Sequence, residues 1–264
     1  MKQQLKALWS IGGMVWHSLR TAAAGLRGVP HYFRDLGALS AQSQSAGIPF
    51  PFGRFYPCLA DRFMESGVAK GHYFHQDLLV AGRVFANAPA RHIDVGSRID
   101  GFVAHVAAFR PIEVVDIRPL SSATRNLAFI RFDLMAPLKA EYVACCDSLS
   151  CLHALEHLGL GRYGDPVNAD GYRAGLDNLG RMLRPGGTFY VSVPIGPQRI
   201  EFNAHRVFAV RTLLDLFEGQ FRIERFSCVD DAGALHESVP LDEAGVKANF
   251  GCRFGCGIFE MTKL

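Results

Sequence analysis

Apolar and polar residues follow two patterns along residues 88–264: short apolar runs, and longer stretches with apolar residues at helical spacing. The short runs predict strands and the helically spaced stretches predict helices. Their regular alternation predicts a mostly parallel sheet with helices on both faces. We expect strands at 91–95, 112–117, 127–132, 142–147 and 187–193, and helices at 101–109, 148–158, 169–184 and 209–218.

Two connections refine this sheet. Only about ten residues separate Asp116 from the next strand, so this crossover is reduced to a turn. The last two apolar runs, at 221–229 and 256–264, are joined by a long polar loop instead of a helix, which predicts antiparallel strands at one edge. The expected fold class is therefore α/β, with a doubly wound, mostly parallel, seven-stranded Rossmann-like sheet whose last strand is antiparallel.

The chain before the sheet has a different pattern. Residues 1–46 are compatible with helix, and the stretch 48–59 contains too many prolines for a regular helix, so we expect it to form an irregular strap. Residues 75–87 again have helical spacing and lead into the first strand. We therefore divide the chain into a helical N-terminal extension with a Pro/aromatic strap, residues 1–87, and a main domain, residues 88–264.

The N-terminal extension is basic as well as apolar. Trp9 and Trp16 lie among five basic residues that precede the first acid, Asp35: Lys2, Lys6, Arg20, Arg27 and Arg34. The segment lacks the run of about 18 uncharged apolar residues that a membrane-spanning helix needs. Two interpretations stay open: a solvated helix packed on the main domain, or an interfacial helix through which residues 1–34 contact an anionic membrane.

Composition narrows the class of protein. With 49% hydrophobic and 20% charged residues, the 264-residue chain is typical of globular proteins. A net charge of +3 is too small to indicate a nucleic-acid partner. Seven cysteines without pairwise spacing, and no secretory signal, predict reduced thiols and a cytoplasmic protein. If the N-terminus touches lipid, its place is the inner face of the membrane.

The stretch from Arg91 to Val106 carries the candidate chemistry. It joins an apolar strand, a glycine turn from Gly96 to Gly101 and an apolar helix, and Asp116 closes the next strand. This order is typical of nucleotide-binding βαβ units, in which glycine allows close approach of the ligand and the later carboxylate holds a ribose diol. A degraded G-x-G-x-x-G would also serve a nicotinamide-dependent oxidoreductase, which stays an alternative.

The glycine turn, Asp116 and the reversed last strand together resemble the class I S-adenosylmethionine-dependent methyltransferases over residues 88–264. The resemblance implies S-adenosylmethionine as cofactor, and RPGG at 184–187 matches the turn before the fifth strand. It places Asp116 at the ribose hydroxyls and Asp133 and Leu134 at the adenine. The glycine turn would bind the cofactor through Asp94, Gly96, Ser97 and Gly101.

The turn departs from the family pattern in one respect. Arg98 and Asp100 stand where the family has glycine, and Gly101 would substitute by letting the next helix approach. A non-catalytic binding or scaffold protein with this fold is therefore a further alternative. Four runs more narrowly resemble the uncharacterised domain-of-unknown-function family 268, which implies a fold and a cofactor but no substrate: GHYFHQDLLVA, DVGSRIDGFVAHV, ALEHLGLGRYGDP and FNAHRVF.

Candidate catalytic residues follow the fourth strand. Glu156 and His157 match an E-H pair of many small-molecule methyltransferases, at the sheet edge where ligands bind. We expect His157 to take the proton of a hydroxyl acceptor and Glu156 to orient it, with His205 as the second candidate base. The expected function is O-methylation of a polar small molecule, a sugar or a glycan.

The same segment spells H-x-x-E-H at 153–157, the inverted zinc-protease motif. On a helix, His153 and His157 would share a face at ligand spacing. The motif also needs an acidic ligand on a later helix, and the late acids here fall in strands and loops. We therefore expect no metal.

Overall fold

The computed structural model describes residues 25–43 and 50–264. The chain divides into two compact units between Val68 and Ala69. The helix before the first strand packs into the second unit through Val80, Ala81 and Val84.

The first unit contains a helix over residues 25–43 and a short turn, η1 (Asp61–Phe63). Residues 50–60 have almost no regular structure, as the prolines predicted. Most of the segment 1–34, for which we considered membrane contact, lies outside the described residues. Among the helices that the structure describes, none is both long enough and apolar enough to cross a bilayer.

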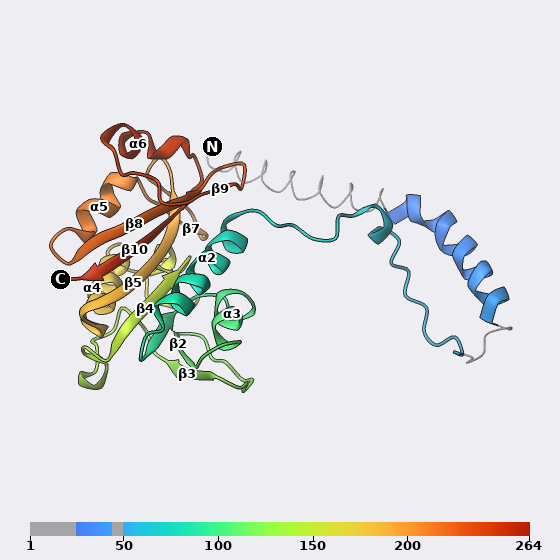
Figure 1. Cartoon of the computed structure of the whole chain (residues 1–264), viewed down its shortest axis with the longest axis horizontal. Coiled ribbons are helices and arrows are strands. Elements are labelled where there is room, and N and C mark those ends of the chain that lie inside the picture. Colours follow the sequence, from blue (N-terminus) through green and yellow to red (C-terminus); the bar gives the residue numbers. More distant parts are fainter. Residues whose placement is uncertain (1–24, 44–49) are drawn as a thin grey trace. The chain divides into compact units, whose positions relative to one another are not determined.

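Within its described residues, the second unit is built on an eight-stranded sheet in the order β3-β2-β1-β4-β5-β10-β8-β9 (Figure 1). Its strands are β1 (His92–Val95), β2 (Ile112–Asp116), β3 (Leu127–Arg131), β4 (Cys146–Leu152), β5 (Leu183–Ile195), β8 (Phe221–Val229), β9 (Leu235–His236) and β10 (Gly255–Lys263). A separate hairpin follows β5 and pairs β6 (Arg199–Glu201) with β7 (His205–Val207).

The first five strands are parallel, and β10 runs antiparallel to both β5 and β8. This confirms the predicted fold class, with the two-residue β9 as an addition to the seven expected strands. Residues 117–126 contain no helix, so the second crossover is a turn as predicted. The RPGG segment does not precede β5 but lies inside it, where the register with β4 shifts between Cys146 and Ser148.

Helices cover both faces of the sheet. The helical segments are α2 (His72–Asn87), η2 (Ile99–Val103), α3 (Ala104–Ala107), η3 (Ala140–Tyr142), η4 (Leu155–His157), α4 (Gly171–Met182), α5 (Val210–Phe217), α6 (Glu243–Lys247) and η5 (Asn249–Gly251). One apolar core lies under α2, η2 and α3, and a larger one lies under α4 and α5. The carboxyl ends of β1, β2 and β4 therefore meet at one edge between two helical layers.

The sequence prediction was wrong at β4. The strand expected at 142–147 spans Cys146–Leu152, and the helix expected at 148–158 is absent, since only η4 is helical there. Two buried serines interrupt the apolar run of this strand. Ser148 bonds the His92 ring at 2.8 Å, and Ser150 donates to Asp94 at 2.6 Å. The apolar pattern therefore does not reveal this buried strand, because its serines form hydrogen bonds with polar residues of β1 inside the sheet.

Candidate functional site

An open pocket with a cavity volume of about 140 Å³ lies at the carboxyl ends of β1, β2 and β4. This is the edge at which open α/β sheets bind ligands. Four of the residues predicted to bind the cofactor line it: Gly96, Asp116, Asp133 and Leu134. We call these four residues the cofactor wall.

Gly96 sits where β1 ends and must be glycine for two reasons. Its φ is +74°, in the left-handed region, and a Cβ atom there would come within 2.8 Å of the Ala154 Cβ. Its N–H donates to the Val115 carbonyl, which ties the turn to β2. The backbone is therefore bare where a ligand would lie against it.

Asp116 lines the pocket and forms an ion pair with Arg118. The Arg118 guanidinium donates to both carboxylate oxygens, at 3.0 and 2.6 Å, and the Arg118 N–H donates to one of them at 2.8 Å. The hydrogen bonds to Asp116 raise the pKa of Arg118. The guanidinium also lies 4.3 Å from the centre of the Tyr163 ring. A ribose diol would have to share the carboxylate with Arg118 or displace it.

Asp94 and Ser97 lie behind this wall. Asp94 is fully buried and accepts hydrogen bonds from the Ser97 N–H, the Ser97 hydroxyl and the Ser150 hydroxyl. Burial raises the pKa of Asp94 to about 6, against the opposing effect of these hydrogen bonds. The structure brings the two residues together to hold the turn, at a step removed from the pocket surface.

Gly101 also lies behind the wall, in η2. A side chain there would collide with the carboxylate of Asp77 on α2. The glycine therefore allows η2 to pack closely against α2, which precedes β1, whereas the predicted approach concerned the helix that follows the turn.

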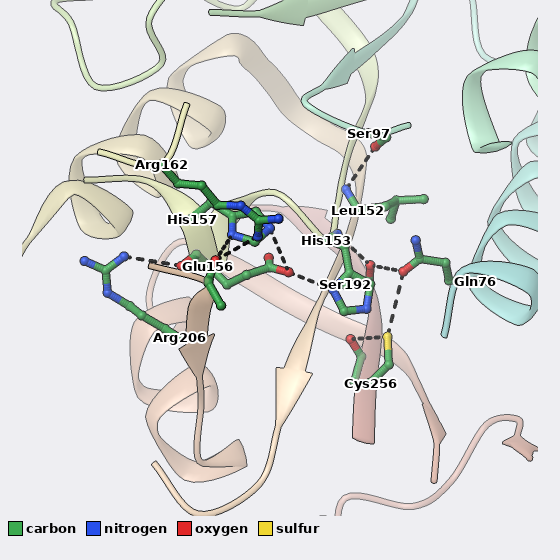
Figure 2. A network of polar contacts seen from close by, with 12 residues as sticks. Gln76, Ser97, Leu152, His153, Glu156, His157, Arg162, Ser192, Arg206 and Cys256 are labelled. Carbon is green, nitrogen blue, oxygen red and sulfur yellow. Dashed lines mark hydrogen bonds and ion pairs between the residues drawn. The ribbon is translucent and has the colours of Figure 1, made fainter. Parts of the chain in front are cut away.

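The segment after β4 contributes polar side chains to the pocket lining, and Figure 2 shows how they lie. His153 has a φ of +50°, so the chain turns sharply at the end of the strand instead of continuing as a helix. His153 and His157 consequently do not share a helical face, and the H-x-x-E-H spacing does not form a protease-like site. Both rings line the pocket, and Glu156 is buried between them at 1% exposure.

Glu156 holds the two histidines. The His153 Nδ1 lies 2.7 Å from the Glu156 Oε1, and the His157 Nε2 lies 3.8 Å from the same oxygen. Burial opposes ionisation of Glu156, but the neighbouring His153 and His157 outweigh it, so the pKa of this carboxyl is lowered. The carboxylate is thus charged, buried and placed to stabilise a proton on either ring.

His157 is oriented by a backbone contact. Its Nδ1–H donates to the Ala204 carbonyl at 2.7 Å, because a carbonyl can only accept. In the neutral ring, Nε2 therefore carries the lone pair. Burial lowers the pKa of His157, opposed in part by Glu156, so the ring is neutral and basic at neutral pH. The Tyr163 ring packs edge-on against it at 5.4 Å between centroids.

The His205 ring lies next to the His157 ring. Their ring centroids are 6.3 Å apart, and His205 stacks on Phe254 at 4.9 Å. It is not part of the pocket lining. The next residue, Arg206, donates to the backbone carbonyls of Leu158 and Ala169 at 2.6 and 3.1 Å.

Sequence reasoning missed three residues near this site. Tyr73 of α2 lines the pocket, with the Arg98 guanidinium 5.0 Å from its ring centre. His72 stacks on His153 at 5.2 Å between ring centroids, and Cys256 of β10 lies near both histidines. The run GHYFHQD showed that aromatic residues precede the sheet, but only the fold shows which of them face the pocket.

Comparisons with known proteins agree with this architecture. Residues 123–246 match the model of a family described as Caenorhabditis protein of unknown function, DUF268. No curated protein sequence matches the chain. Among solved structures, the [4+2]-cyclase SpnF is similar with a TM-score of 0.50 and 15% identity, over 72% of this chain and 80% of that one.

Two methyltransferase structures with S-adenosylhomocysteine are also similar. The 1,6-didemethyltoxoflavin-N1-methyltransferase of Burkholderia thailandensis has a TM-score of 0.49 and 18% identity, over 71% of this chain and 78% of that one. The N-methyltransferase NodS of Bradyrhizobium japonicum has a TM-score of 0.48 and 13% identity, over 73% and 88%. The match over residues 123–246 agrees with the expected resemblance to DUF268, and the second unit is similar in its α/β fold to SpnF.

Proposed function

We propose that this chain is an S-adenosylmethionine-dependent methyltransferase that acts on a hydroxyl group of a polar small molecule, a sugar or a glycan. One observation carries the proposal: a strand-end carboxylate, Asp116, and an oriented neutral histidine, His157, line the same pocket.

The cofactor wall fits this cofactor. The bare backbone at Gly96 would accommodate the ligand where a Cβ would crowd the turn. Asp116 would accept the ribose hydroxyls, and Asp133 and Leu134 would face the adenine. Asp133 accepts a hydrogen bond from the Met135 N–H at 2.9 Å, so its carboxylate is held by its own turn. Asp94 and Ser97 would act indirectly, by holding the turn.

The chemistry asks little of the protein. The cofactor supplies an activated methyl group on a sulfonium, so the chain must align the acceptor, exclude water and accept one proton. His157 would take the acceptor hydroxyl proton at Nε2. The Glu156 carboxylate, 3.8 Å from that nitrogen, would stabilise the imidazolium, and the Ala204 carbonyl would keep the ring in position.

Arg118 supports the alternative of a non-catalytic binding protein, because it occupies the Asp116 carboxylate. The methyltransferase would transfer a methyl group to an acceptor, whereas the binding protein would only bind the cofactor. We would incubate the full chain with S-adenosylmethionine carrying a labelled methyl group and a panel of sugars, glycans and small polyols. Label in an alkali-stable O-methyl product is expected, and it should disappear in His157→Ala.

The matched control is His236→Ala. His236 is an exposed histidine paired with Asp230 at 2.8 Å, away from the pocket, and its removal should leave transfer unchanged. Cofactor binding without transfer to any hydroxyl would contradict the enzyme and favour the binding protein. Label on nitrogen alone would contradict the hydroxyl acceptor.

A further inference from the structure

Three potential metal ligands from distant parts of the sequence meet beside the pocket. His72 begins α2, His153 follows β4, and Cys256 lies in β10. One ligand atom from each residue lies within 4.8 Å of the other two. We call these residues the His-His-Cys cluster.

The His153 ring has the orientation expected of a metal ligand. Its Nδ1–H donates to the Glu156 carboxylate at 2.7 Å, so Nε2 is the ring nitrogen that would bind a metal, with release of any proton it carries. That Nε2 is buried and has no hydrogen-bond partner among the residues that the structure describes. A carboxylate on the far nitrogen is the usual support of a metal-binding histidine. Figure 2 shows the ring between Glu156 and the Cys256 sulfur.

Cys256 also has no strong alternative partner. Its side chain is fully buried, and its sulfur lies 3.8 Å from the Gln76 Oε1 and 4.0 Å from the Gly257 carbonyl, both long contacts. The Gln76 oxygen already accepts a 2.6 Å hydrogen bond from Ser192. The thiol is therefore held next to two imidazoles without a good hydrogen bond of its own.

The spacing suits a small cation. A point between three atoms that are at most 4.8 Å apart lies within about 2.8 Å of each of them. Zinc needs about 2.0–2.1 Å to nitrogen and about 2.3 Å to sulfur. Side-chain movements of less than about 1 Å would close that difference, and His72, which is half-buried at the start of its helix, is the ligand best placed to make them.

We propose that His72, His153 and Cys256 form a binding site for a borderline-soft divalent metal, with Zn²⁺ as the best match to two imidazoles and one thiolate. Glu156 would be a positioning residue that holds the His153 ring. Three protein ligands would leave a fourth position for a water molecule. His157 takes no part, since the three ligand atoms that lie within 4.8 Å of one another belong to His72, His153 and Cys256. This site does not depend on the proposed methyl transfer.

The test is metal binding by the full chain. The protein is stripped with a chelator, dialysed and titrated with Co²⁺, then with Zn²⁺. We expect one Co²⁺ per chain, with a sulfur-to-cobalt charge-transfer band in the near ultraviolet, and its displacement by one Zn²⁺. The band should be absent in Cys256→Ser, and His72→Ala should weaken Co²⁺ binding by at least about tenfold.

Matched controls separate ligation from folding. Cys252→Ser changes another buried cysteine, and His75→Ala changes another histidine of α2; neither residue belongs to the cluster, so both variants should keep the band. Glu156→Gln should keep the band while lowering metal affinity by about 10–100-fold. Circular dichroism and melting curves show which variants are folded, and if Cys256→Ser is not, the half-buried His72 is tested through His72→Ala and His72→Gln.

The proposal is overturned if the wild type binds no stoichiometric metal, if Cys256→Ser keeps the charge-transfer band, or if Cys252→Ser loses it as well. Binding of S-adenosylhomocysteine is measured on the same samples. A chain that binds this ligand but no metal contradicts only the metal site, and a chain that binds metal but not the ligand contradicts only the proposed function.

Discussion

The cofactor wall and the segment after β4 line the same pocket but differ in how their residues are held. Gly96, Asp116 and Asp133 follow strand ends, and their hydrogen-bonding partners are close in sequence or on the next strand. His153, Glu156 and His157 depend on distant partners: the Ala204 carbonyl, His72 and Cys256. The wall is therefore suited to the proposed ligand binding. The residues after β4 are ionisable and held in fixed orientations, which suits the proposed proton transfer.

The largest effect is expected from removing the proposed base, His157. His157→Ala should lower turnover by about 10²–10⁴-fold while affinity for S-adenosylhomocysteine stays near wild type. We would measure both quantities on the same preparation, with His236→Ala as the control. If ligand binding falls together with the rate, His157 is structural. An unchanged rate would move the role to His205.

The pH profile sharpens the same assignment. Burial lowers the pKa of His157, so the neutral form should persist below the ordinary histidine range. The rate should be constant above about pH 6.5 and fall only as the pH drops through the lowered pKa, because the protonated ring cannot accept the acceptor proton. A rate that rises as the pH falls would contradict a histidine base.

The next effect concerns Asp116 of the cofactor wall and the affinity for S-adenosylhomocysteine. Asp116→Ala should weaken S-adenosylhomocysteine binding by about 10–100-fold, since a charge-assisted hydrogen bond contributes roughly 1.5–3 kcal/mol. Calorimetric titration would measure it, and Asp215→Ala is the control, because Asp215 is an exposed carboxylate of α5 outside the pocket. An Asp116 variant with wild-type affinity would show that the carboxylate stays with Arg118 and does not hold the ribose.

A smaller effect tests the backbone of the wall. Gly96→Ala forces a side chain into a φ of +74° and against Ala154, so the free energy of unfolding should fall by about 1–3 kcal/mol. Gly82→Ala is the matched control: this exposed glycine of α2 has open space at its Cβ, and the change should be neutral or slightly stabilising. Urea unfolding compares the two variants, and equal losses would remove the special role of Gly96.

The smallest expected effect concerns His92 and the pH dependence of the free energy of unfolding. His92 is buried between Ser148 and Ser150, and burial lowers its pKa to about 3. In the unfolded chain His92 is protonated as the pH falls through about 6.5, whereas in the folded chain it stays neutral. The free energy of unfolding should therefore decline as the pH falls below about 6.5. Between pH 7 and 5.5 the expected loss from this residue is about 1 kcal/mol. Urea unfolding of His92→Gln should show a correspondingly weaker pH dependence, and an identical dependence would contradict the assignment.

The same comparison explains what could be predicted from the sequence. Gly96 and Asp116 each lie at the end of an apolar strand, so local pattern and the general rule for strand ends locate them, whereas Asp133 was predicted through the family resemblance. Strand β4 could not be located in this way. Ser148 and Ser150 interrupt its apolar run, because their partners are His92 and Asp94 on the neighbouring strand. His72 and Cys256 approach His153 only through the order of the sheet and the packing of α2.

The most direct test of the account is calorimetric titration of the wild-type chain with S-adenosylhomocysteine and, separately, with NAD. We predict saturable binding of one S-adenosylhomocysteine per chain and no comparable binding of NAD. A chain that prefers NAD, or that binds neither ligand, would contradict the assignment of the pocket at the ends of β1, β2 and β4.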